Sequence, residues 1–95
     1  MLNKEYHFRQ GIKNIPEICA QHGVRKVIIA PGSRNAPLIF AFTTQPGMEC
    51  LSITDERSAA YFALGMAQQS GEAVALVCTS GTAVLNFAPA IAEAY

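Results

Sequence analysis

Three short apolar runs, each followed by a polar corner and a helical pattern, constrain the fold of this chain more than any other feature. The runs cover residues 26–30, 49–53 and 73–78. The first and third contain almost no polar alternation, which is typical of strands covered on both faces. Strands and helices that alternate along a chain favour a parallel sheet joined by right-handed crossovers. We therefore predict an α/β fold: an open parallel sheet with helices on both faces, built from one helix and three strand–helix units.

The helical patterns place the predicted helices between these runs. Apolar residues at helical spacing predict a first helix over about 6–22, which Pro16 should kink or divide. Ser33 is a natural N-cap for the second helix, and Pro37 is tolerable only in its first turn. A third helix should run to about residue 70. A fourth should begin near Ala83 and be kinked by Pro89.

Small residues recur on the third predicted helix. Ala59, Ala63 and Ala67 lie four residues apart with Gly65 beside them, so another backbone can come close to this helix. The sheet of this domain and another subunit are equally good partners for that surface. The sequence does not separate these two alternatives.

The composition suggests a piece of a larger, covered structure. The 95 residues suffice for one domain at most, and only 15% are charged, against about 25% in an ordinary soluble domain. The formal net charge is zero, with no basic stripe of the kind that binds nucleic acid. No apolar run approaches the roughly 20 residues that span a bilayer. We expect a cytoplasmic protein.

The three cysteines fit this compartment. Cys19, Cys50 and Cys78 are an odd number with no close pairing, so we predict reduced, buried thiols. Their spacings match no metal-ligand pattern, and we expect no metal ligands within the chain.

The polar corners are the candidate functional positions. They cover residues 31–34, 54–57 and 79–82, each directly after a predicted strand. In a parallel sheet all three must lie on one edge, beside the crevice in which ligands of such sheets bind. Turn chemistry and helix capping account for most of these residues, including Asp55. They do not account for Arg34, which would oppose the dipole of a helix in its first turn and therefore indicates a nearby anion.

Common nucleotide and hydrolase sites are excluded by what the corners lack. Both histidines lie near the first helix, so no Ser/His/Asp set is available. No lysine follows Gly81 as in a phosphate-binding loop, and no glycine-rich dinucleotide motif follows the first strand.

The three corners together resemble the N-terminal pyrimidine-binding domain of thiamine-diphosphate enzymes. The segments that carry the resemblance are Ala-Pro-Gly-Ser-Arg at 30–34, Asp-Glu-Arg-Ser-Ala at 55–59 and Thr-Ser-Gly-Thr-Ala at 79–83. Related decarboxylases and acetolactate synthases usually have His-Glu in place of Asp55-Glu56 and Gly-Pro-Gly in place of the residues 80–82. The chain is therefore more similar to the menaquinone-pathway synthases of this superfamily, and the similarity extends from the first helix to Tyr95.

The resemblance implies a role for several residues. Glu56 matches the glutamate that contacts a ring nitrogen of the aminopyrimidine and so promotes deprotonation of the thiazolium carbon; such a glutamate should be desolvated. Ser33 and Arg34 would bind a substrate carboxylate. Thr79, Ser80 and Gly81 would lie beside the pyrimidine or the adjoining substrate pocket. Arg57 is as easily structural, paired with a neighbouring carboxylate.

The resemblance also implies an activity and its partners. These synthases decarboxylate 2-oxoglutarate and add the remaining carbon fragment to isochorismate, using thiamine diphosphate and Mg²⁺. The diphosphate and the metal are held by another domain, on another subunit of a homodimer or homotetramer. Residues 1–95 would then be the N-terminal portion of the pyrimidine-binding domain, with the other domains absent and no activity of their own.

Two alternatives stay open at this stage. One is another thiamine-diphosphate 2-oxoacid decarboxylase or synthase. The other is a small non-catalytic α/β module that binds an anion through Arg34, with Glu56 only a charge at a helix end.

Overall fold

A computed structural model describes residues 2–95, with side chains described from Gln10 onward. The elements in chain order are α1 (Leu2–Gln21), β1 (Lys26–Ile29), α2 (Ala36–Thr44), β2 (Glu49–Ser52), α3 (Glu56–Ser70), β3 (Val74–Val77), α4 (Thr82–Leu85) and α5 (Ala88–Ala94). Within this part of the chain the three predicted strands all form.

The strands make one parallel sheet in the order β2-β1-β3. Ile29 of the central strand is in register with Ser52 on one side and Val77 on the other. The pairing continues past the strand ends, where the amide of Ile53 donates to the Ile29 carbonyl and that of Ala30 to the Val77 carbonyl, both at 2.8 Å. The predicted open parallel sheet is confirmed.

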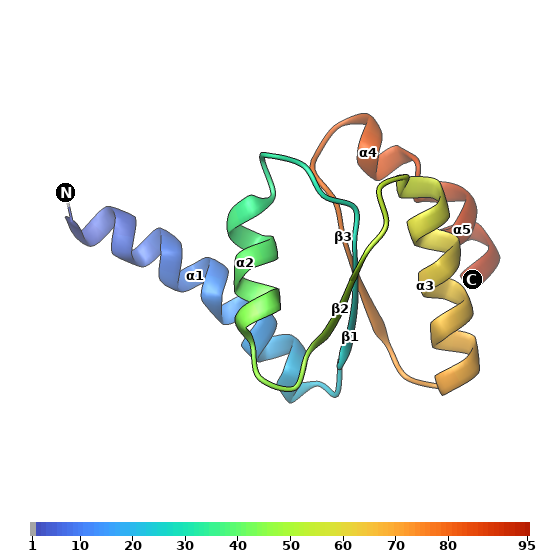
Figure 1. The fold of residues 1–95 in the computed structure, drawn as a ribbon, viewed down its shortest axis with the longest axis horizontal. Coiled ribbons are helices and arrows are strands. Elements are labelled where there is room, and N and C mark those ends of the chain that lie inside the picture. Colours follow the sequence, from blue (N-terminus) through green and yellow to red (C-terminus); the bar gives the residue numbers. More distant parts are fainter. Residues whose placement is uncertain (1) are drawn as a thin grey trace.

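Helices cover both faces of the sheet. In Figure 1, α1 and α2 lie on one side of the strands, and α3 and α5 lie on the other. Alternate residues of β1 face the two layers, because successive side chains of a strand point to opposite faces. Val27 and Ile29 pack against Phe42 of α2, whereas Ile28 packs against Ala59 of α3. The central strand is therefore buried on both faces, as its unbroken apolar run predicts.

Proline and turn residues give three departures from the predicted helices. The helix α1 runs through Pro16 without division, and the proline ring is fully buried. The last predicted helix is two helices, α4 and α5, and Pro89 occupies the first turn of α5. A continuous helix would need an N–H at Pro89 for the Leu85 carbonyl, which proline does not have.

The third departure concerns the start of α2. This helix begins at Ala36 and its N-cap is Asn35, so the prediction of Ser33 as N-cap is wrong. Arg34 consequently lies in the turn before the helix and not in its first turn. Pro37 lies in the first turn, as expected.

The small-residue surface of α3 faces the sheet of this chain. Ala59 and Ala63 are buried in the cluster that contains Ile28 and Ala30. Gly65 is exposed, and a Cβ at this position would meet nothing within 4 Å. Ala59 and Ala63 are therefore explained by packing within the domain, whereas the space into which a Cβ of residue 65 would point is open. None of the described helices is both long and apolar enough to cross a membrane.

Candidate functional site

The three polar corners emerge together at the carboxyl edge of the sheet. The strand register brings the residues after Ile29, Ser52 and Val77 to the same edge. From β1 the chain continues into α2 on one face, whereas from β3 it continues through α4 to α5 on the opposite face (Figure 1). The β1 and β3 corners thus flank a topological switch point, where open α/β sheets bind their ligands.

The β1 corner is held by a buried asparagine. The side-chain oxygen of Asn35 accepts a hydrogen bond from the Gly32 amide at 2.9 Å, and its Nδ2 donates to the Ala30 carbonyl at 3.2 Å. Asn35 is 6% exposed and is the one buried polar side chain in the described part of the chain. Both ends of the turn between β1 and Arg34 are therefore fixed by one side chain.

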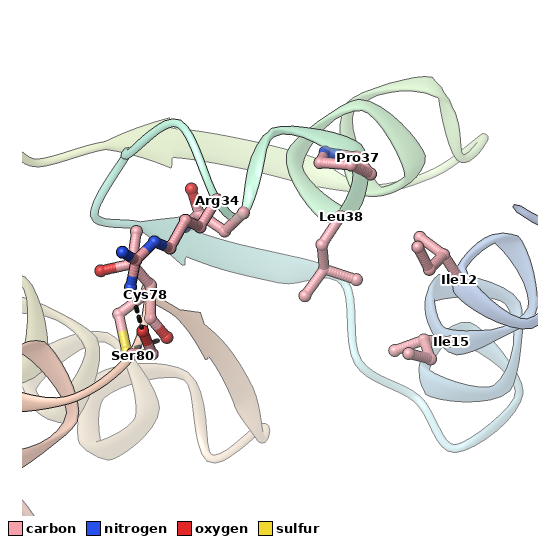
Figure 2. A pocket seen from close by; sticks show the side chains of 9 residues that line it. Ile12, Ile15, Arg34, Pro37, Leu38, Cys78 and Ser80 are labelled. Atoms are coloured by element: carbon pink, nitrogen blue, oxygen red, sulfur yellow. Dashed lines mark hydrogen bonds between the residues drawn. The ribbon is translucent and has the colours of Figure 1, made fainter. Parts of the chain in front are cut away.

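Arg34 reaches from this turn to the β3 corner. Its Nη1 donates to the hydroxyl of Ser80 at 3.5 Å, and Figure 2 shows the guanidinium lying over that serine. Both side chains are exposed, so a ligand can approach them from solvent. Ser33, in the same turn as Arg34, is also exposed.

A second contact joins the same two corners. A Cβ built on Gly32 would collide with Cγ2 of Thr79, and only glycine fits this approach without displacement. The β3 corner then turns sharply at Gly81, whose φ of 63° and ψ of −125° suit the first central position of a type II′ turn. The Ala83 amide closes this turn by donating to the Ser80 carbonyl at 3.3 Å.

The β2 corner carries the acidic groups. Asp55 is the N-cap of α3, and its Oδ2 accepts a hydrogen bond from the Ser58 amide at 2.9 Å. The backbone and side-chain hydrogen bonds from Ser58 hold the pKa of Asp55 below its ordinary value, and the charge of Arg57 adds a smaller effect. Asp55 is thus structural, as capping chemistry predicts. Glu56, the first residue of α3, is half-buried.

The electrostatic effect of Glu56 reaches Cys78, at the β3 corner. Burial is the main cause that raises the pKa of the Cys78 thiol, and the Glu56 carboxylate raises it further. Cys78 directly follows β3 and is half-buried. Glu56 and the β3 corner therefore belong to one electrostatic environment, although Glu56 and Cys78 are 22 positions apart in the sequence.

The β1 and β2 corners have opposite electrostatic character. Asp55 caps α3, but no side chain caps the N-terminus of α2, and the first turn of α2 holds no acidic residue. The positive end of the α2 dipole therefore adds to the charge of Arg34. An anion is favoured at the β1 corner, whereas the β2 corner offers a carboxylate acceptor.

A pocket of about 330 Å³ opens beside the β1 and β3 corners. Figure 2 shows Arg34 and Ser80 at one side of it, with Leu38 pointing between them and the isoleucines of α1. Its walls are mostly apolar, and its lining residues are Ile12, Ile15, Arg34, Asn35, Pro37, Leu38, Cys78, Thr79 and Ser80.

Of the predicted site residues, Arg34, Thr79 and Ser80 line one pocket. Glu56 stands at the same sheet edge beyond it. The sequence analysis missed Asn35 and the two isoleucines of α1. An asparagine directly before a helical pattern was the available signal for Asn35, but it indicates a cap first. In the described residues, no cluster of three or more His, Cys, Asp or Glu side chains could hold a metal ion.

Comparison with known proteins defines the class to which this fold and site belong. The family of the thiamine pyrophosphate enzyme N-terminal TPP binding domain matches residues 9–95. The chain belongs to this family.

Two of the most similar curated relatives carry the same name. The chain is 52% identical over 94 residues to the 2-succinyl-5-enolpyruvyl-6-hydroxy-3-cyclohexene-1-carboxylate synthase of Porphyromonas gingivalis. The aligned region covers 99% of this chain and 16% of that enzyme. It is 56% identical over 87 residues to the synthase of the same name from Desulfotalea psychrophila, with 92% of this chain and 16% of that enzyme covered. The chain therefore spans about 16% of the length of these relatives.

Proposed function

We propose that this chain is the N-terminal portion of the pyrimidine-binding domain of a thiamine-diphosphate-dependent transferase. The activity proposed for the whole protein is that of a 2-succinyl-5-enolpyruvyl-6-hydroxy-3-cyclohexene-1-carboxylate synthase in menaquinone biosynthesis. It would decarboxylate 2-oxoglutarate and add the remaining carbon fragment to isochorismate. The shared name of the relatives and the family match support this assignment over other thiamine-diphosphate enzymes and over a non-catalytic module.

The residues at the sheet edge fit the aminopyrimidine half of the cofactor. Its ring nitrogen needs a carboxylate partner, and Glu56 supplies one at the first position of α3. Beside it, the β3 corner offers the hydroxyls of Thr79 and Ser80 and the backbone of Gly81. Thiamine diphosphate, when bound, would supply the electron sink that decarboxylation of a 2-oxoacid requires.

Glu56 is proposed as the residue that shares a proton with this ring nitrogen. Glu56 is the first residue of α3, so its position is fixed by the start of that helix. Its half-buried position reduces competition from water and strengthens a hydrogen bond to the ring nitrogen. Glu56 would thereby hold a proton at that ring nitrogen and fix the orientation of the aminopyrimidine ring.

Arg34 and Ser33 are proposed to bind the carboxylate of the 2-oxoacid. The guanidinium of Arg34 is planar and can donate two parallel hydrogen bonds to a carboxylate. The uncapped N-terminus of α2 adds a positive field at the same place. Both charges are oriented before substrate arrives, and this lowers the cost of binding.

The rest of the cofactor would lie outside these 95 residues. We propose that the diphosphate and its Mg²⁺ are held by a different domain, on the partner subunit of a homodimer or homotetramer, and that the chain alone is inactive. Large apolar side chains on α4 and α5 support a covered surface, since Leu85 is 70% exposed and Ile91 59%. The free thiols of Cys19, Cys50 and Cys78 support a cytoplasmic location.

The substrate assignment rests on one observation. The hydrogen bond from Arg34 to Ser80 holds the charged guanidinium between the β1 and β3 corners, at the switch point of the sheet. Replacing Arg34 by alanine in the intact enzyme should raise the KM for 2-oxoglutarate by roughly 10²-fold, because a charge-assisted bidentate contact is lost. The Arg25→Ala variant, an exposed arginine before β1, is the matched control. Unchanged KM in the Arg34→Ala enzyme would refute the assignment.

A further inference from the structure

We propose that Asn35 is a positioning residue that presets Arg34 for carboxylate recognition. The proposal rests on the carboxylate-binding role assigned to Arg34 above. It adds a residue that acts through the turn in which Arg34 lies.

The hydrogen bonds of Asn35 bind both ends of that turn. The Gly32 amide donates to Oδ1 at 2.9 Å, and Nδ2 donates to the Ala30 carbonyl at 3.2 Å. Asn35 is more than nine-tenths buried, so water does not compete for these bonds. A buried amide with both a donor and an acceptor satisfied is held firmly, because breaking either bond leaves an unpaired polar group.

These bonds are made in place of a helix cap. An asparagine at an N-cap ordinarily accepts a hydrogen bond from the second or third amide of its helix. Asn35 makes no such bond, and the second residue of α2, Pro37, has no N–H to offer. The side chain is turned back toward the preceding loop. The Asn35 side chain therefore does not cap α2 in this fold.

The constraint on Gly32 passes directly to Arg34. With its amide tied to Asn35, Gly32 sits against the side chain of Thr79, so the turn has no room to move toward β3. Arg34 is the neighbour of Asn35 in sequence and reaches Ser80 with its guanidinium. The backbone that carries Arg34 is thus anchored on one side by Asn35 and limited on the other by Thr79.

Precise placement matters for the contact that Arg34 is proposed to make. Two parallel hydrogen bonds to a carboxylate require the guanidinium plane to be correctly oriented. A displacement of about 1 Å in a positioning element can cost roughly 10²-fold in an enzyme. Loss of the Asn35 bonds should therefore weaken binding of the 2-oxoacid while leaving the Glu56 side of the site unchanged.

A double-mutant cycle in the intact enzyme tests this inference. The variants are Asn35→Ala, Arg34→Ala and the combination, assayed for kcat and for KM with 2-oxoglutarate at saturating isochorismate. The Kd for thiamine diphosphate is measured as a separate readout. If Asn35 acts through Arg34, Asn35→Ala raises the KM about tenfold or more in the parent enzyme and less than about threefold in the Arg34→Ala background. The kcat and the cofactor Kd stay within about threefold.

The other outcomes separate the two proposals. An unchanged KM for Asn35→Ala, or an equal rise in both backgrounds, overturns the positioning role and leaves the function of Arg34 intact. An unchanged KM for Arg34→Ala overturns the carboxylate assignment and the inference with it. Should Asn35→Ala fail to fold, Asn35→Asp takes its place in the cycle, because aspartate keeps an acceptor for the Gly32 amide and loses the donor to Ala30. The same cycle pattern is then expected, with a rise of severalfold.

Discussion

Arg34 and Ser80 are 46 residues apart in the sequence and are joined by a hydrogen bond of 3.5 Å across the carboxyl edge of the sheet. The bond is long, exposed and made to a neutral hydroxyl. A substrate carboxylate would offer the guanidinium shorter and stronger charge-assisted bonds. The hydrogen bond therefore orients the Arg34 side chain without fixing it rigidly. A ligand can replace Ser80 as the acceptor or bind the guanidinium together with it.

Removal of the Ser80 hydroxyl should weaken substrate binding modestly. In the intact enzyme, Ser80→Ala frees the guanidinium of Arg34. We expect the KM for 2-oxoglutarate to rise about two- to fivefold, since a long, exposed hydrogen bond to a neutral hydroxyl is worth about 0.5–1 kcal/mol. Steady-state kinetics measure this change. Ser52→Ala, at an exposed serine of β2, is the control. An effect as large as that of Arg34→Ala would show that Ser80 has a role of its own.

Substitution of Glu56 by glutamine should abolish most of the turnover. Glutamine keeps the size of the side chain but cannot share a proton in the way a carboxylate does. We expect the kcat of the intact enzyme to fall by about 10²–10⁴-fold, the usual contribution of a positioned proton-transfer group. Glu72→Gln, in the exposed turn after α3, should be neutral. A Glu56→Gln enzyme with nearly full turnover would contradict the catalytic role.

The contact between Gly32 and Thr79 predicts a mutation and its rescue. A Cβ at residue 32 would collide with Cγ2 of Thr79 but would lie at an ordinary 3.6 Å from Thr79 Cβ. Gly32→Ala should therefore destabilise the protein by about 1–3 kcal/mol through overpacking. The double variant with Thr79→Ser, which lacks the colliding methyl, should recover most of this loss. Urea denaturation measures both, and a double variant no more stable than Gly32→Ala would disprove the steric cause.

The cap of α3 predicts a pH-dependent stability. Hydrogen bonds from Ser58 favour the charged form of Asp55 in the folded state, so its pKa lies below the ordinary 3.8. The stabilisation is fully present above the unfolded-state pKa and is lost as the pH falls through the lower folded-state pKa. The Tm difference between the parent and Asp55→Ala should thus be constant at neutral pH and shrink below about pH 4.

Asp55→Asn is the control for this titration. Asparagine is about as good an N-cap as aspartate but carries no titrating charge. Its Tm should lie near that of the parent protein at neutral pH and should not share the loss in acid. A Tm difference between the parent and Asp55→Ala that stays constant down to pH 2 would exclude a contribution from the ionised cap.

The 95 residues alone should not bind the cofactor measurably. If the diphosphate and Mg²⁺ are held by another domain, this chain contacts only the pyrimidine half of thiamine diphosphate. Titration calorimetry of the purified chain at micromolar cofactor should show no heat of binding, whereas the intact enzyme should bind with a Kd in that range or below. Micromolar binding by the short chain would refute the proposed division of the site.

Local patterns in the sequence account for most of the fold. The β-branched run before Pro31 predicts a strand covered on both faces, and β1 is buried on both. Gly71 predicts the end of α3, and it adopts a φ of 71° at the C-cap. These features depend on neighbours within a few residues, so they can be predicted from the sequence. Pro16 is different: it does not divide α1, and its ring is fully buried.

The sequence by itself also determined which residue types stand at the carboxyl edge of the sheet. Only the tertiary structure decided which of them meet. Arg34 faces Ser80, and Gly32 faces Thr79, because β3 adds to the side of β1 opposite β2. That strand order depends on α2 and α3 packing on opposite faces, which no local pattern encodes. Asn35 lies before a helix and would be expected to cap it. Its burial and the proline at the second position of α2, which has no N–H, instead leave its side chain bonded to the Ala30 carbonyl and the Gly32 amide.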